Sequence, residues 1–321
     1  MKTTLQWLFT ICLFLTSQSF YGQQIASKTE NPKYIGTPTK VEKVSSIASR
    51  ATLVRPELAR TKEMNDGRAS KNKEVTIGKG SIGSDALAEA PHRLKNAIDT
   101  KEPLLVFETG ASGSSPTDPA GAVGPNHYIS VINTAFQIFD KDGNSLTGGL
   151  VSPNPTIFPS GGCCDLTVSY DNAADRWVMS FLGGGAQIAV SDGPDPLNDD
   201  WTVYTYGSVI DYQKLSVWHD GYYMTDNASG TFHVFERAEM LAGNIGAQLV
   251  SFTVPGWQDP GGFDSPQFLN LSHDAVVTGP AVMVYFADDG WGSVSQDDHI
   301  KLWDVTMDWA NASSSAVTGP T

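Results

Sequence analysis

Residues 211–236 read DYQKLSVWHDGYYMTDNASGTFHVFE, and this stretch contains both signals that decide the fold. The first signal is an acid, Asp211, which stands just before short segments of alternating apolar and polar residues. The second signal is FHVFE at residues 232–236, in which the first and third residues are apolar and the fifth is an acid. Short alternating segments bounded by Gly, Asn and Asp are typical of antiparallel β-strands.

Both signals recur four times along the chain in the same order. The first signal is an aspartate, and its spacings are 47, 46 and 53 residues: Asp118, Asp165, Asp211 and Asp264. The second signal stands at residues 136–140, 188–192, 232–236 and 300–304. A further extended run follows it, as at residues 201–206, so each unit supplies about four strands. Self-similarity at this period indicates a repeat architecture.

A repeated unit of 40–50 residues with four short strands matches the blade of a β-propeller. No helix of crossover length separates the strands, which excludes a parallel α/β fold. A β-sandwich is the competing all-β architecture, but it does not predict a recurring pair of signals. We therefore predict an all-β chain with four recognisable four-stranded propeller blades over residues 102–321. Four such blades form an incomplete ring, so we expect further blades beyond Thr321.

The N-terminus has the composition of an export signal. Lys2 precedes an apolar stretch over residues 5–15, and small residues follow up to Gly22, which predicts a signal peptide over residues 1–22. Residues 23–101 contain one aromatic residue, Tyr34, among many Lys, Ser, Thr and Glu. Such a segment buries too little apolar area to offset its ordering entropy, so we expect an irregular leader or pro-segment.

Charge excludes one class of partner. The chain has a formal charge of −14, and residues 102–321 hold 26 acidic against 5 basic side chains. Such a domain repels phosphate, so we expect no nucleic-acid partner. No apolar run after residue 22 reaches the roughly 18 residues that a spanning helix needs, so we expect no integral membrane segment after signal cleavage.

Several strings resemble a known class of proteins. AVGPNHYISVIN, SYDNAADRWVMSF, VSDGPDPLNDDWTVY and DYQKLSVWHDGYYMTDN, within residues 115–256, together resemble secreted bacterial β-propeller proteins of the type that often carries a type IX secretion C-terminal sorting domain. The resemblance implies a secreted or cell-surface propeller in an extracellular location. It implies no catalytic residues. Residues 163–166, CCDL, depart from the Gly-Asp-Pro usual at that place, and no sorting domain is present up to Thr321.

The four repeated aspartates are the candidate ligand or cation site. In propeller geometry the first strand of each blade lines the channel, so Asp118, Asp165, Asp211 and Asp264 would form an acidic ring there. Carboxylates set close together favour a bound cation, and calcium is the one that we consider; no cofactor is required. The alternative is that each Asp caps a turn by accepting backbone N–H bonds.

Two tryptophans are candidate stacking platforms for a glycan, Trp257 and Trp291, with blade packing as the alternative role. The two cysteines left after signal cleavage, Cys163 and Cys164, are adjacent. They could close a small disulfide ring, stay reduced, bind metal weakly or cross-link to another chain.

The function that we predict is that of a binding module for a glycan or an extracellular protein. The alternative is an extracellular carbohydrate-active hydrolase that uses the channel-face carboxylates, because such enzymes need two carboxyl groups and one of them with a raised pKa. No Gly-x-Ser-x-Gly motif occurs in a strand-to-helix setting, which argues against a serine hydrolase. The catalytic residues of any enzyme activity stay unknown at this stage.

Overall fold

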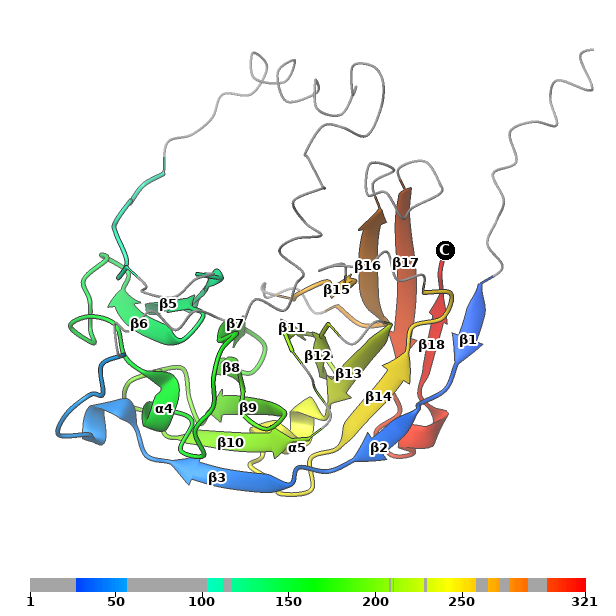
Figure 1. Ribbon diagram of the computed structural model, residues 1–321, viewed down its shortest axis with the longest axis horizontal. Helices are drawn as coiled ribbons and strands as arrows, with labels where there is room; N and C mark the ends of the chain where they lie inside the picture. Colours follow the sequence, from blue (N-terminus) through cyan, green and yellow to red (C-terminus); the bar gives the residue numbers. More distant parts are fainter. Residues whose placement is uncertain are drawn as a thin grey trace, which may run out of the picture.

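Antiparallel β-strands make up nearly all the regular structure of the computed structural model (Figure 1), which describes residues 27–56, 103–111, 117–207, 209, 211–227, 230–257, 265–271, 277–287 and 299–321. The helices of these residues are short: η1 (Ile47–Ser49), α4 (Pro153–Thr156), α5 (Arg237–Leu241) and η2 (Ala312–Ser314). The prediction of an all-β chain is confirmed. None of the helices in this part of the chain is long and apolar enough to span a bilayer.

The strands form four antiparallel sheets that follow one another along the chain. The first sheet contains β4 (Pro119–Val123), β5 (His127–Ile132) and β6 (Ala135–Asp140). The second contains β7 (Thr167–Asp171), β8 (Arg176–Leu182), β9 (Ala186–Ser191) and β10 (Trp201–Tyr206). The third contains β11 (Lys214–Val217), β12 (Tyr222–Thr225), β13 (Thr231–Phe235) and β14 (Leu249–Thr253). The fourth contains β15 (Gln267–Phe268), β16 (Ala281–Ala287), β17 (His299–Thr306) and β18 (Ala316–Gly319).

The two sequence signals fall at corresponding places in these sheets. Each repeated aspartate stands within a few residues of the first strand of its sheet, and each second signal lies in or at the end of the third strand, β6, β9, β13 or β17. The first strands lie next to one another in the order β4, β7, β11 and β15. The four predicted units are therefore four antiparallel sheets in series. The predicted count of four strands per blade is wrong for these sheets. The first has three strands, with isolated bridges from Ser145 and Val151 to its outer strand β6, and each of the others has a fifth strand from residues 28–44.

The leader differs from the expectation of an irregular segment. Residues 27–56 contain β1 (Lys28–Glu30), β2 (Tyr34–Gly36) and β3 (Lys40–Val44), which pair with the outermost strands β18, β14 and β10. In Figure 1 this blue segment follows the outside of the arc formed by the sheets. Composition did not predict this order, because edge strands are held mainly by backbone hydrogen bonds and Val44 and Ile47 are the two buried residues of the described segment 27–56. The remainder of the predicted leader, residues 57–101, lies outside the described part, as does the predicted signal peptide.

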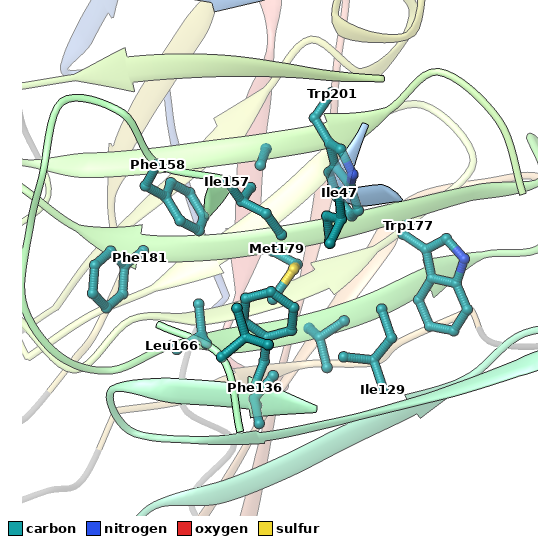
Figure 2. Packing of buried hydrophobic residues seen from close by; sticks show 14 of the residues in the cluster. Ile47, Ile129, Phe136, Ile157, Phe158, Leu166, Trp177, Met179, Phe181 and Trp201 are labelled. Atoms are coloured by element: carbon teal, nitrogen blue, oxygen red, sulfur yellow. The ribbon is translucent and has the colours of Figure 1, made fainter. Parts of the chain in front are cut away.

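The core lies between successive sheets, so the middle sheets are buried on both faces. In β8, Trp177 and Met179 pack toward the first sheet while Val178 packs toward the third. Figure 2 shows Trp177 and Met179 of the second sheet beside Ile129 and Phe136 of the first, with Trp201 next to Ile47. Alternate residues of a strand point to opposite faces, and both faces of these strands are apolar because a sheet covers each one.

Candidate functional site

Three of the four repeated aspartates lie at the same end of neighbouring first strands. Asp118 precedes β4, Asp165 precedes β7 and Asp211 precedes β11. Asp118 and Asp165 adopt left-handed backbone conformations, with φ of 37° and 55°. Asp tolerates this region better than most residues because its short side chain bonds locally. Asp264 lies outside the described residues, so its predicted place in the ring stays a prediction.

Asn133 connects the first aspartate to the second. It lies in the turn between β5 and β6, and its Nδ2 donates to Oδ2 of Asp118 at 3.1 Å. Its Oδ1 accepts from the backbone N–H of Asp165 at 2.9 Å. One side chain thus bridges the first and second sheets. The sequence analysis missed it, although an Asn follows the repeated aspartate after 15 residues here and after 16 residues at Asp211.

Asp165 connects the second sheet to the third. Its Oδ2 accepts from the backbone N–H of Tyr212 at 3.1 Å, and its backbone oxygen accepts from Nε2 of Gln213 at 2.7 Å. The Asp165 side chain therefore does not cap its own turn, because the N–H that donates to it belongs to the segment before β11 of the next sheet. Oδ1 of Asp165 and Oε1 of Gln213 are buried and have no hydrogen-bond partner among the described residues. Both residues are nearly inaccessible to solvent, at 2% and 0% exposed.

Asp211 repeats in the third sheet the pairing that Asp118 makes in the first. The backbone N–H of Asn227 donates to the backbone oxygen of Asp211 at 2.9 Å, and its Nδ2 approaches Oδ2 of Asp211 at 3.4 Å. Asn227 lies between β12 and β13, where the corresponding residue of the first sheet is Asn133. The aspartates of these two sheets are thus paired with an Asn from the hairpin of their own sheet.

Lys214 stands among these carboxylates at the start of β11. Its ammonium lies 3.2 Å from the ring centroid of Tyr212 and 3.4 Å from the backbone oxygen of Gln213. Burial lowers the pKa of Lys214, while the charges of Asp165, Asp118 and Asp211 act in the opposite direction. We call Asp118, Asp165, Asp211 and Lys214 the acidic cluster. Its three carboxylates outnumber its one cation.

Burial raises the pKa of Asp165 to about 6. The Tyr212 N–H opposes this shift, as does Lys214, whereas the neighbouring charges of Asp211 and Asp118 add to it. A carboxyl group that loses water and gains only one hydrogen bond holds its proton more tightly. Asp165 therefore titrates near neutral pH.

Cys163 and Cys164 form a disulfide with each other directly before Asp165. The Cys163 N–H donates to the backbone oxygen of Leu182 at 2.9 Å, which ties the segment to the end of β8. Cys163 is exposed and Cys164 is half-buried. Of the four states that the sequence left open, the structure contains the small ring. It adds a solvent-facing apolar group beside the acidic cluster.

The calcium prediction receives no support from the geometry. In the described residues, no three His, Cys, Asp or Glu side chains are grouped so that they could hold a metal ion. Lys214 supplies positive charge at the place where the sequence suggested a cation. Calcium binding in the channel stays a prediction.

Trp257 packs into the protein. It is half-buried against the core between the third and fourth sheets, and its ring meets that of Tyr285 edge-on with centroids 4.8 Å apart. This is the packing role that the sequence left open as the alternative to ligand stacking. Trp291 lies outside the described residues.

A second polar group was missed by the sequence analysis. Nδ1 of His233 lies 2.8 Å from Oγ of Ser251, and Nε2 lies 3.3 Å from Oδ2 of Asp226. These residue types match a hydrolytic triad, but none of the three is more than 4% exposed. A substrate has no access to a serine sealed within the third sheet, so the group cross-links three segments of that sheet.

The second and third sheets are joined by a buried ion pair. Asp171, the last residue of β7, accepts from Nε and Nη2 of Arg237 at 2.6 and 2.9 Å and from the Tyr222 hydroxyl at 2.9 Å. Burial lowers the pKa of Arg237, but the hydrogen bonds and charge of Asp171 outweigh it and raise that pKa above its ordinary value. Bidentate pairs of this kind hold a fixed geometry. The pair has a structural role.

The comparisons with known proteins assign no family. No protein-family model matches the chain, and neither the curated proteins nor the solved structures contain a match to it.

Proposed function

We propose that the chain is a β-propeller binding module whose ligand site is the acidic cluster. The observation behind this proposal is that Asp118, Asp165 and Asp211 stand at the same end of successive first strands, where hydrogen bonds of Asn133 and Tyr212 connect Asp165 to its two neighbours. Four sheets in series, with their first strands adjacent, are the arrangement that propeller blades have around a channel. A rigid frame that presents polar groups at one end suits recognition.

The chemistry of the cluster favours a ligand that donates hydrogen bonds. Carboxylates only accept, and those of Asp118 and Asp211 belong to half-buried residues that a ligand can reach. Sugar hydroxyls, or the ammonium and guanidinium groups of a protein, supply such donors. The exposed Cys163–Cys164 disulfide adds an apolar surface beside them. We therefore propose a glycan or a basic surface of an extracellular protein as the ligand.

The test uses a glycan array and a pull-down from extracellular protein. We expect a bound ligand to be lost in Asp118→Asn with Asp211→Asn, which removes two charges and keeps the side-chain size. The matched control is Asp192→Asn, because Asp192 is exposed and, within the described part of the chain, its side chain pairs only with Lys43 and Thr202. Retention of binding in the double variant would move the ligand site elsewhere.

One observation favours the hydrolase as a second candidate. Asp165 has a raised pKa and stands beside two further carboxyl groups, which is the combination that glycoside hydrolysis uses. The 2% exposure of Asp165 opposes this role, because a general acid must reach the glycosidic oxygen. Release of reducing sugar from extracellular polysaccharide, abolished in Asp165→Asn, would establish hydrolysis. Binding without turnover would leave the binding module.

We also propose that the mature protein is secreted or held at the cell surface, as the signal peptide over residues 1–22 and the resemblance to type IX secretion propellers suggest. N-terminal sequencing of the exported protein is expected to begin at Gln23. A mature protein that keeps residues 1–22 would contradict export by signal cleavage.

Calcium is tested separately by calorimetry. If the cluster binds calcium, the Lys214→Met variant is expected to bind it more tightly. The variant lacks the Lys214 ammonium, which otherwise repels calcium and partly neutralises the carboxylates. A flat trace for both proteins would end the calcium proposal and leave the binding proposal intact.

A further inference from the structure

The N-terminal segment is attached to the sheets in two different ways. We call residues 28–36, with β1 and β2, the outer part, and residues 40–55, with β3 and η1, the anchored part. The outer part covers the edges of the fourth and third sheets, and the anchored part covers the edge of the second and reaches the first. Residues 37–39, Thr-Pro-Thr, connect the two parts.

The anchored part is held by buried side chains. β3 pairs with β10 from Lys40 to Val44, and Val44 and Ile47 enter the core at 5% and 1% exposure. Nη2 of Arg50 donates to the backbone oxygen of Thr156 at 2.6 Å. Arg55 donates to the backbone oxygens of Leu150 and Thr147 at 3.0 Å each. Apolar anchors and directed hydrogen bonds make this attachment specific to these side chains.

The outer part has no buried side chain. All three residues of β1 are exposed, and in β2 Tyr34 and Ile35 are 49% and 41% exposed. Its side-chain contacts are few, with Thr29 Oγ1 3.0 Å from Oγ1 of Thr318 and Asn31 Nδ2 3.3 Å from the backbone oxygen of Ser315. Antiparallel backbone pairing supplies the remaining attachment. Such pairing is satisfied equally by a strand of the same sequence from another molecule.

We propose that the edges of β14 and β18 form a strand-binding surface on which residues 28–36 of a second copy of this chain replace those of the first. The exchanged segment makes the same backbone pairs with β14 and β18 of the second molecule that it makes within its own. The number and kind of contacts are therefore equal before and after the exchange. Thr37 and Pro38 form the hinge, because Thr39 is already fixed to β10 by its N–H, which donates to the backbone oxygen of Thr205 at 2.8 Å. Pro38 cannot donate a backbone hydrogen bond, which leaves the hinge without one bond that would fix it to a sheet.

The exchange is expected only in concentrated protein. A strand linked through this two-residue hinge competes for its own edge at an effective concentration on the order of 1 mM. Protein held near about 1 mM and then diluted is therefore expected to retain a dimer fraction that protein held at micromolar concentration lacks.

A mixing experiment with two full-length variants tests the exchange directly. Thr29 and Thr318 stand opposite each other in the β1–β18 pair, and both lie at the surface. A Thr29→Cys protein and a Thr318→Cys protein are mixed near about 1 mM and oxidised. A covalent heterodimer is expected, because the two new thiols meet only when the outer part of one copy lies on β18 of the other. The matched control replaces Thr318→Cys with Thr306→Cys, an exposed position on β17 that does not face β1.

The double variant Thr29→Cys with Thr318→Cys, oxidised at low concentration, locks the outer part onto its own molecule. We expect this locked protein to remain monomeric at high concentration, while the matched Thr29→Ser with Thr318→Ser protein forms the dimer. No heterodimer above the Thr306→Cys level, despite ready formation of the lock, would overturn the proposal. A dimer that persists in the locked protein would overturn it too, since that dimer would use another surface.

Hydrogen exchange supplies the second readout. We expect the amides of residues 28–36 to exchange faster than those of residues 40–44 by about a factor of ten or more, because the outer part opens without exposing core side chains. Equal protection of the two parts would contradict the opening on which the exchange depends.

Discussion

Two buried aspartates stand at the opposite ends of strand β7, and their surroundings differ. Asp171, which ends the strand, is met by Arg237 through two hydrogen bonds and by the Tyr222 hydroxyl. Asp165, which precedes the strand, accepts one hydrogen bond through Oδ2 and leaves Oδ1 unpaired. They are 1% and 2% exposed, so the difference between them lies in their partners and not in their burial.

The comparison separates a structural carboxylate from a candidate functional one. A buried charge that is fully paired holds two sheets in a fixed relation, because each partner satisfies the other. A buried carboxyl with an unsatisfied oxygen costs stability, and such groups are concentrated at binding and catalytic sites. The end of β7 that carries Asp165 is therefore the end where we look for a ligand.

The largest expected effect comes from Arg237→Met. This change leaves the charge of Asp171 buried without a cation, with the Tyr222 hydroxyl and the Ala174 backbone N–H as its hydrogen-bond donors, and breaking such a pair costs about 3–5 kcal/mol of unfolding free energy. Urea denaturation measures it. The control is Lys43→Met at the exposed Lys43–Asp192 pair, where we expect a loss below about 1 kcal/mol. Equal losses in the two variants would show that the buried Asp171–Arg237 pair stabilises the protein no more than an exposed ion pair does.

Asp165→Asn is expected to stabilise the protein above pH 6. The pKa of Asp165 in the folded protein, about 6, lies above its ordinary value in the unfolded chain. Below about pH 4 the carboxyl is protonated in both the folded and the unfolded protein, so its full contribution to stability is present there. That contribution is lost as the pH rises to about 6, and it amounts to at most about 3 kcal/mol. The variant lacks this loss.

Urea denaturation from pH 4 to pH 8 measures the Asp165 effect. The stability gap between Asp165→Asn and the unchanged protein should open between about pH 4 and 6 and stay constant above. Asp171→Asn is the contrasting control, since it deprives Arg237 of its counter-charge and should destabilise at every pH. A gap that does not change with pH would show that Asp165 ionises normally.

Tyr222→Phe is expected to cost about 2 kcal/mol, because a hydroxyl that donates to the Asp171 carboxylate is lost while both Arg237 bonds remain. The matched control is Tyr206→Phe. The equally buried Tyr206 donates to the neutral backbone oxygen of Ala247 at 3.0 Å, so its loss should cost about 1 kcal/mol. Thermal unfolding measures both losses. A larger loss in Tyr206→Phe than in Tyr222→Phe would contradict the expectation that a hydrogen bond to the charged Asp171 is the stronger one.

Lys214→Met is expected to have the smallest effect on stability and a clear effect on titration. Without the ammonium the pKa of Asp165 should rise above its present value of about 6, since Lys214 now holds it down. Carboxyl carbon NMR shifts follow this titration. Lys141→Met, at an exposed turn, is the control and should leave the Asp165 titration unchanged. An unchanged pKa in Lys214→Met would remove Lys214 from the acidic cluster.

The repeat was readable because each sheet uses the same residues at the same places. An acid before the first strand and an apolar pair before an acid in the third strand are local features, set by turns and alternation. The first sheet departs from the pattern, because its outer strand β6 is met by isolated bridges at Ser145 and Val151 instead of a fourth strand. Nothing local in that segment distinguishes a strand from a bridge.

The leader was misjudged for a physical reason. Composition measures how much apolar area a segment buries, and residues 28–36 bury almost none. They are ordered by the unpaired edges of β14 and β18, which belong to residues more than 200 positions away. The sequence of residues 28–36 alone therefore does not predict that these strands form.

The amino-acid sequence by itself determined the all-β class, the four repeated units and the position of an aspartate before each first strand, because turn chemistry and strand alternation act over a few residues. The tertiary structure alone decided that Asn133 bridges Asp118 to Asp165, that Lys214 stands among the carboxylates, and that Asp171 is paired while Asp165 is not. These facts depend on which sheets lie side by side. Burial and charge are properties of neighbours, and the neighbours of Asp165 come from three sheets.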